Sequence, residues 1–200
     1  MTGRVRRREL AEPERRERIE ALHETVRAIL RGPKPVIAAV DGCAAGAGVS
    51  IALACDLLVM AEDAYLSLAY VTVGLSPDGG ATAFLPEFMP RQLLVELVLT
   101  GVRILTRPLA NLVVVNQVAA PGGAGQEAVT LAQRLAHGPQ RAMVRIKAPS
   151  LSAYRNSLES QLDAEADRMA ASLGDVESTG GIQAFFDKRA ADCISLGKVS

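Results

Sequence analysis

The sequence predicts an α/β fold in which a mixed core is followed by a layer of helices. Buried strand patterns alternate with helical patterns between Lys34 and Pro86, whereas from residue 126 onward the apolar residues keep only helical spacing. The chain has 200 residues, 49% of them hydrophobic, which suffices for one core. We therefore expect residues 1–125 to form the α/β core and residues 126–200 to form a helical layer that packs on this core or on another subunit.

The first predicted element is an amphipathic helix that begins near Pro13 and ends before Gly32. Arginines and glutamates are interleaved along it, which favours a salt-bridged, exposed helix face over a nucleic-acid-binding patch. The apolar residues of this helix recur every three or four positions: Ile19, Leu22, Val26, Ile29 and Leu30.

A strand, a glycine-rich turn, a helix and a second strand follow in that order. The apolar run Val36–Val40 predicts a buried strand, and Asp41-Gly42 predicts a turn after it. The spacing of Ser50–Ala54 predicts a helix, and the apolar run Leu57–Ala61 predicts the second strand. Between them, Gly46-Ala47-Gly48 has side chains small enough for a ligand to approach the backbone.

The rest of the core is predicted to contain shorter elements. We expect strands at Tyr65–Leu68 and Val113–Val115, because both are short apolar runs between turn signals. Gly74–Gly80 reads as a long turn, and Ala81–Leu85 as a short helix. Arg91–Thr100 has the apolar spacing of a helix.

The C-terminal part is predicted to be entirely helical. Helices are expected at Gln126–Ala136 and, as one long element, at Ser150–Leu173. After Gly180-Gly181 a final short helix should carry Ala184–Arg189.

Composition and charge exclude several classes of function. The formal net charge is zero and no apolar run reaches the roughly 18 residues of a membrane span, so neither nucleic acid nor a membrane is an expected partner. The N-terminus has no apolar stretch of the kind found in secretory signals, so none is expected. The cysteines Cys43, Cys55 and Cys193 are scattered, which fits free thiols of a cytoplasmic protein. No pattern indicates a metal site, and His23 and His137 are expected to be surface residues.

The turn at Gly46–Gly48 is the strongest candidate for a functional site. A strand that enters such a turn at the start of a helix gathers free N–H groups and the positive end of the helix dipole. This arrangement suits an anion, or an oxygen that becomes negative during a reaction.

Four stretches together resemble the crotonase superfamily, the enoyl-CoA hydratase/isomerase group. They are KPVIAAVDG, AAGAGVSIALACD, GLSPDGGATAFLP and AFFDKR, in this order and spacing. The resemblance covers roughly residues 33–190. It implies the crotonase spiral of repeated strand–strand–helix turns, a homotrimer or hexamer in which residues 126–200 associate, and acyl-CoA thioester substrates. Coenzyme A would enter as part of the substrate, and no separate cofactor is implied.

The shared chemistry of this superfamily is the stabilisation of a thioester enolate by two backbone N–H groups. The resemblance places the N–H of Ala47 as the second donor of this oxyanion hole, with Gly46 and Gly48 beside the substrate. The alternative is that Gly46-Ala47-Gly48 is only a closely packed helix start.

The acid and base residues distinguish the reactions of the superfamily. Its hydratases use two glutamates, and this chain has Ser50 and Tyr70 at those positions, so a hydratase would lack both groups. The chain resembles more closely the isomerases that act on enoyl-CoA and on epoxyphenylacetyl-CoA, which carry an aspartate in a GL-x-PD-x-G loop. Here this residue is Asp78, followed by Gly79. A partly desolvated carboxylate there could move a proton between two carbons, although Pro77-Asp78-Gly79 could also be an ordinary turn.

The other candidate residues each allow two interpretations. Ser50 could hydrogen-bond a substrate or its own helix turn, of which the second is preferred. Tyr70, placed on a strand, could line the acyl site or only pack. Phe185 and Lys188 match positions that touch coenzyme A in the family, through stacking on adenine and contact with a phosphate, but both could be plain surface residues.

Residues 1–33 lack the F-x-A-G-x-D type of loop that supplies the first oxyanion donor in the family, so the core is expected to lack its usual first strands. Three hypotheses follow. The chain is an enoyl-CoA isomerase with Asp78 as base, a catalytically silent crotonase-like subunit, or a hydratase of 2-enoyl-CoA.

Overall fold

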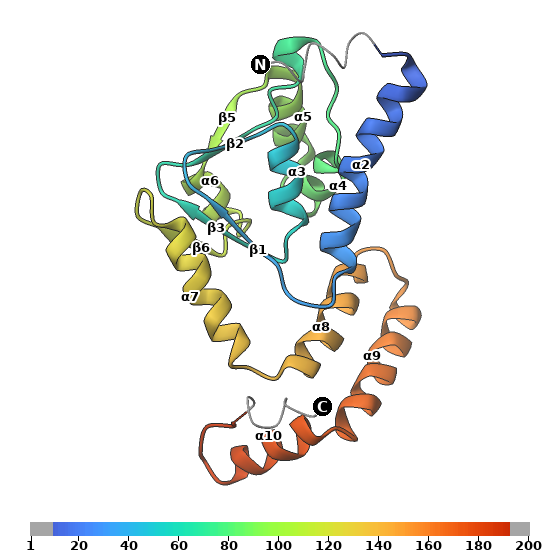
Figure 1. Ribbon diagram of the computed structural model, residues 1–200, viewed down its shortest axis with the longest axis vertical. Helices are drawn as coiled ribbons and strands as arrows, with labels where there is room; N and C mark the ends of the chain where they lie inside the picture. Colours follow the sequence, from blue (N-terminus) through green and yellow to red (C-terminus); the bar gives the residue numbers. More distant parts are fainter. Residues whose placement is uncertain (1–9, 193–200) are drawn as a thin grey trace. The chain divides into compact units, whose positions relative to one another are not determined.

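The computed structural model describes residues 10–192, and Figure 1 shows its helices and strands. The chain forms two compact units. The first contains residues 1–31 and 38–125, and the second contains residues 32–37 and 126–200. The predicted α/β class holds for the first unit, and the C-terminal part is helical as expected.

The first unit alternates short strands with helices. Its helices are α2 (Glu12–Arg31), α3 (Ala47–Ala54), α4 (Ala81–Phe84), α5 (Arg91–Thr100) and α6 (Thr106–Asn111), with 3-10 turns at Val71–Val73 and Leu85–Glu87. Its strands are β1 (Ile37–Val40), β2 (Cys43–Ala45), β3 (Leu57–Ala61), β4 (Tyr65–Ser67), β5 (Arg103–Leu105) and β6 (Gln117–Ala119). The strand expected at Leu57–Ala61 and the helix expected at Arg91–Thr100 are confirmed with the same bounds.

The strands form two small sheets, ordered β1-β3-β6 and β2-β4-β5. β3 runs parallel to β6, and β2 runs parallel to β4, which pairs antiparallel with β5. Val59, Met60 and Ala61 of β3 are fully buried, so this strand lies at the centre of the unit. A crossover between parallel strands requires an intervening connection, which α3 provides between β2 and β4.

The long N-terminal helix packs along α3 (Figure 1). Val26 of α2 is buried with Ala54 of α3 and Phe84 of α4, in one apolar cluster. On the outer face Arg27 forms ion pairs with Glu20 and Glu24, which confirms the salt-bridged face expected from the sequence. The helix thereby packs against the end of α3 and against α4.

The strand expected at Val113–Val115 is wrong. Val113 has a left-handed backbone with φ of 60°, so the chain turns there after α6. The strand begins later because Asn116 fixes its start: the Asn116 side chain accepts the Leu58 N–H at 2.8 Å, and the Asn116 N–H donates to Leu58 O at 2.9 Å. β6 then pairs with β3 from Gln117 onward.

The helices of the C-terminal part are α7 (Ala124–Ala136), α8 (Gln140–Ser152), α9 (Leu158–Leu173) and α10 (Val176–Phe186). The single helix expected at Ser150–Leu173 is therefore wrong: it is broken at residues 153–157, where the Ser157 hydroxyl caps α9 by accepting the Ser160 N–H. The final helix starts earlier than expected, because Asp175 caps it, and Gly180-Gly181 lies within it.

A buried acidic pair joins α8 to α10. Asp175 accepts hydrogen bonds from Arg141 and Arg145 of α8, at 3.0 and 2.8 Å, and the Arg145 guanidinium is the main cause that lowers the pKa of Asp175. The Glu177 carboxylate accepts the N–H groups of Arg141 and Ala142, which lie at the first turn of α8. The second unit is thus held by charged groups that are bonded to one another.

Thr106 connects the two sides of the β3–β4 turn. It is fully buried, and its hydroxyl lies 2.6 Å from Ala61 O and 3.0 Å from Ala64 O. We expect Thr106→Val to lower the free energy of unfolding by about 1–2 kcal/mol, because this buried hydrogen bond is lost without change of shape. Urea denaturation measures the change. Thr130→Val, which removes an exposed hydroxyl from α7, is the control, and equal effects of the two changes would contradict the assignment.

Within the described residues, no helix combines the length and the apolar character that crossing a membrane requires.

Candidate active site

The start of α3 presents free backbone N–H groups. Gly46 precedes the helix with φ of 55°, and its own N–H donates to Ser67 O on β4. The N–H groups of Ala47 and Gly48 have no acceptor among the described residues. They lie at the positive end of the helix dipole, so this is the place expected for a developing oxyanion.

The Tyr70 ring covers Gly46. A side chain at position 46 would begin 3.6 Å from the Tyr70 ring and 3.7 Å from its hydroxyl oxygen. The prediction that Tyr70 lies on a strand is wrong: β4 ends at Ser67, and Tyr70 is the residue before the 3-10 turn. The turn carries the ring back over the start of α3, which a continued strand would not do.

Tyr70 also holds Asp78. Its hydroxyl donates to Asp78 Oδ1 at 2.6 Å, a short charge-assisted hydrogen bond. Burial raises the pKa of the Tyr70 phenol, and the hydrogen bond to Asp78 and the negative charge of this residue raise it further. The phenol therefore remains a neutral donor at any pH near neutrality.

The raised pKa of Tyr70 predicts a specific dependence of stability on pH. In the unfolded chain the Tyr70 phenol ionises at about pH 10, whereas in the folded protein it stays protonated to higher pH. The contribution of Tyr70 to stability is therefore complete below about pH 10 and is lost as pH rises above that value. We expect the difference in unfolding free energy between the wild type and Tyr70→Phe to shrink between about pH 9 and pH 11. Denaturant titrations at several pH values measure it, and a constant difference would contradict the burial of an intact phenol–carboxylate pair.

Ser50 holds the backbone of the Asp78 segment. Its side chain is fully buried, and its hydroxyl donates to Asp78 O at 2.7 Å. The preferred expectation that Ser50 bonds its own helix turn is therefore wrong. A buried hydroxyl has to be paired, and the Asp78 carbonyl is the partner that the loop brings to it.

Gly79 allows this close approach. It has φ of 70°, and a side chain there would begin 2.8 Å from Ser50 Cβ and 3.2 Å from Leu22 Cδ2. Any side chain at position 79 would therefore collide with Ser50 on α3 and crowd the Leu22 side chain on α2, so the glycine next to Asp78 is required both by backbone conformation and by space.

The structure brings together most of the residues that the sequence singled out. One cluster in the first unit contains Gly46, Ala47, Gly48, Ser50, Tyr70, Asp78 and Gly79. Phe185, in the last turn of α10, and Lys188, just after this helix, belong to the second unit, and both are exposed. Their contact with coenzyme A stays a prediction. Sequence reasoning missed the hydrogen bonds of Tyr70 and Ser50 to Asp78, because no local pattern links residues 8 and 28 positions apart.

The described residues contain no group of His, Cys, Asp and Glu side chains that could hold a metal ion.

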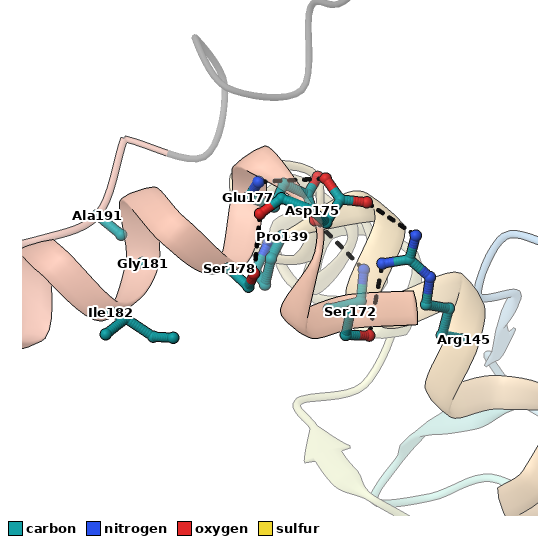
Figure 2. Close-up of a pocket in the computed structure, with 10 residues that line it drawn as sticks. Pro139, Arg145, Ser172, Asp175, Glu177, Ser178, Gly181, Ile182 and Ala191 are labelled. Atoms are coloured by element: carbon teal, nitrogen blue, oxygen red, sulfur yellow. Dashed lines mark hydrogen bonds and ion pairs between the residues drawn. The ribbon is translucent and has the colours of Figure 1, made fainter. Parts of the chain in front are cut away.

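A cavity of about 360 Å³ lies in the second unit (Figure 2). Its lining contains Arg145, Asp175 and Glu177 as well as apolar residues such as Ile182. Asp175 pairs with Arg145 and accepts the Glu177 N–H at the start of α10, and the Glu177 carboxylate accepts a backbone N–H at the start of α8. These charged groups therefore join α8 to α10. The chemistry-bearing cluster is therefore the one around Asp78.

Comparison with known proteins matches the chain to a family. The family model described as enoyl-CoA hydratase/isomerase matches residues 6–193. The chain is 35% identical over 164 residues to "1,2-epoxyphenylacetyl-CoA isomerase" of Escherichia coli strain K12, covering 82% of this chain and 63% of that protein. It is 33% identical over 171 residues to "Probable enoyl-CoA hydratase" of Rhodobacter capsulatus, covering 85% of this chain and 66% of that protein.

Solved structures resemble the fold closely. A crystal structure of an enoyl-CoA hydratase from Polaromonas sp. JS666 superposes with a TM-score of 0.89 at 42% identity, covering 92% of this chain and 72% of the other. The Escherichia coli and Rhodobacter capsulatus relatives are longer than this chain, which spans 63% and 66% of their lengths, slightly less than two thirds.

Proposed function

Because the chain belongs to the enoyl-CoA hydratase/isomerase family, we propose that it binds an acyl-CoA thioester and shifts the double bond of an enoyl group. Asp78 is the proposed base. It takes a proton from the carbon between the thioester and the double bond, and returns it two carbons away. The bonding electrons of the broken C–H bond pass into the thioester oxygen, which becomes an enolate and is regenerated as a carbonyl on return.

The single observation that supports this reaction best is the contact chain from Asp78 to the start of α3. The carboxylate is bonded to Tyr70, and the Tyr70 ring lies against Gly46, next to the free Ala47 N–H. The proposed base and the proposed oxyanion donor thereby belong to the same small cluster, which supports the reaction. A preorganised donor of this kind is worth about 3–4 kcal/mol in other enzymes.

Hydration of a 2-enoyl-CoA is the second candidate. It is favoured by the names of the Rhodobacter capsulatus relative and of the Polaromonas structure. Against it stands the identity of two side chains in the cluster, Ser50 and Tyr70, because neither supplies a carboxylate that could activate water near neutral pH.

The remaining parts of the proposal concern partners. We propose that coenzyme A is bound as part of the substrate, that Phe185 and Lys188 contact its adenine and a phosphate, and that the protein acts in the cytoplasm. Association into trimers or hexamers through residues 126–200 is supported by exposed apolar side chains on α9 and α10, among them Leu158, Leu162 and Phe185.

Product analysis tests the reaction. Purified protein is incubated separately with a 3-enoyl-CoA and a 2-enoyl-CoA, and the products are followed by chromatography and mass. A migrated double bond with unchanged mass supports the isomerase. Gain of one water identifies a hydratase, and no reaction from folded protein identifies a catalytically silent subunit.

A further inference from the structure

The two carboxylate oxygens of Asp78 have different surroundings. Oδ1 accepts the Tyr70 hydroxyl at 2.6 Å, whereas Oδ2 accepts no hydrogen bond from the described residues. Within that part of the chain, no side-chain nitrogen or oxygen is both buried and unpaired, so Oδ2 is accessible. One oxygen is therefore bonded within the protein, and the other has no partner there and is not fully buried.

The group that occupies Oδ1 is itself fixed. The Tyr70 N–H donates to Leu68 O at 2.8 Å, and the Tyr70 carbonyl accepts the N–H groups of Val73 and Leu75 at 3.1 and 2.9 Å. Its ring is held against Gly46. Because the backbone and the ring of Tyr70 are both fixed, little conformational entropy is lost when its hydroxyl positions another group.

The backbone of Asp78 is held as well. The buried Ser50 hydroxyl donates to its carbonyl, and Gly79 packs against the Ser50 side chain. Ser50 and the Asp78 N–H also lie near the phenol oxygen and act to lower the pKa of Tyr70, but burial and the Asp78 carboxylate outweigh them. The phenol therefore remains a donor, and Asp78 is fixed at two atoms.

We propose that Tyr70 is a positioning residue for the double-bond shift, and that its hydrogen bond leaves Oδ2 as the one oxygen of Asp78 that accepts the substrate proton and returns it. This inference rests on the proposed function. In the forward step a substrate C–H bond breaks and an O–H bond forms at Oδ2. In the return step this O–H bond breaks, and a C–H bond forms two carbons away.

A titration without substrate tests the positioning itself. The ultraviolet absorbance of phenolate is recorded against pH for the wild type, Asp78→Asn and the Asp78→Asn/Tyr70→Phe double variant, with circular dichroism as a check of folding. Because the Asp78 carboxylate helps to raise the pKa of Tyr70, one tyrosine should ionise at lower pH in Asp78→Asn, and this change should be absent from the double variant. Asp63→Asn, an exposed carboxylate, is the control and should titrate like the wild type. Superimposable curves for the wild type and Asp78→Asn would overturn the proposal.

Kinetics of Tyr70→Phe test its catalytic consequence. We expect kcat for the double-bond shift to fall on the order of 10–100-fold, while KM changes less than about threefold, because the hydrogen bond acts on the base and not on binding. In heavy water the migrated product of the variant should carry more deuterium than that of the wild type, since a loosened carboxylate exchanges its proton more often before returning it. Tyr65→Phe, on β4 in the same unit, is the matched control and should leave kcat unchanged.

The outcomes separate the two claims. A Tyr70→Phe variant with the kcat and deuterium content of the wild type would overturn the positioning role. A wild type that shifts no double bond, but in which the Tyr70–Asp78 titration coupling is found, would refute the proposed function while the fixed carboxylate stands.

Discussion

Replacing Asp78 with Asn is expected to lower kcat for double-bond migration on the order of 10²–10⁴-fold, the usual contribution of a positioned general base. The amide has nearly the same shape and can still accept the Tyr70 hydroxyl, so the cluster should remain assembled. It cannot accept a proton from carbon at neutral pH. Steady-state kinetics with a 3-enoyl-CoA measure the effect, together with circular dichroism to verify folding.

Asp63→Asn is the matched control for this prediction, because Asp63 is an exposed carboxylate in the β3–β4 turn of the same unit. Its kcat should equal that of the wild type. Activity of Asp78→Asn within about threefold of the wild type would remove Asp78 from the role of base, whatever class of reaction the protein catalyses.

Replacing Gly79 with Ala is expected to destabilise the first unit by about 2–4 kcal/mol. Part of this cost is the left-handed backbone, with φ of 70°, and part is the collision of the new methyl group with the buried Ser50 at 2.8 Å. Since the neighbouring residue is Asp78, catalysis should fall together with stability. Urea denaturation and the same kinetic assay measure the two effects.

Gly42→Ala separates the two causes. Gly42 has a similar backbone, with φ of 79°, but a side chain there would meet nothing within 4 Å. We expect Gly42→Ala to lower the free energy of unfolding by about 1–2 kcal/mol and to leave kcat unchanged. If Gly79→Ala costs no more than Gly42→Ala, then the close packing of the Asp78 loop against α3 is not present in solution.

Much of the fold could be predicted because apolar runs and helical spacing reflect burial directly. β3 is an apolar run whose last four residues are buried, and α5 carries its apolar residues at helical spacing. The same reasoning failed at Val113–Val115, where the apolar run forms a turn between α6 and β6. There the pairing of Asn116 with Leu58 sets the start of the strand, and no single-sequence pattern shows a partner 58 positions away.

The candidate site was predictable in its residue types but not in its connections. The glycine turn before α3 and the Asp78 loop are local patterns, and the resemblance to a family linked them. The roles of Ser50 and Tyr70 depend on how the loop folds back over α3. Both residues bond Asp78, one through its backbone and one through its carboxylate, and such contacts arise only from tertiary packing.

The most direct test of the account is uptake of deuterium from heavy water by acyl-CoA thioesters, detected by mass. Initial rates of uptake are compared for the wild type and Asp78→Asn with a small panel of 3-enoyl-, 2-enoyl- and phenylacetyl-type thioesters. We expect the wild type to incorporate deuterium into at least one thioester next to the carbonyl or two carbons away, and Asp78→Asn to do so at least about 100-fold more slowly. Incorporation by folded Asp78→Asn at a rate within about threefold of the wild type, or no incorporation by folded wild type, would contradict a thioester enolate formed by Asp78.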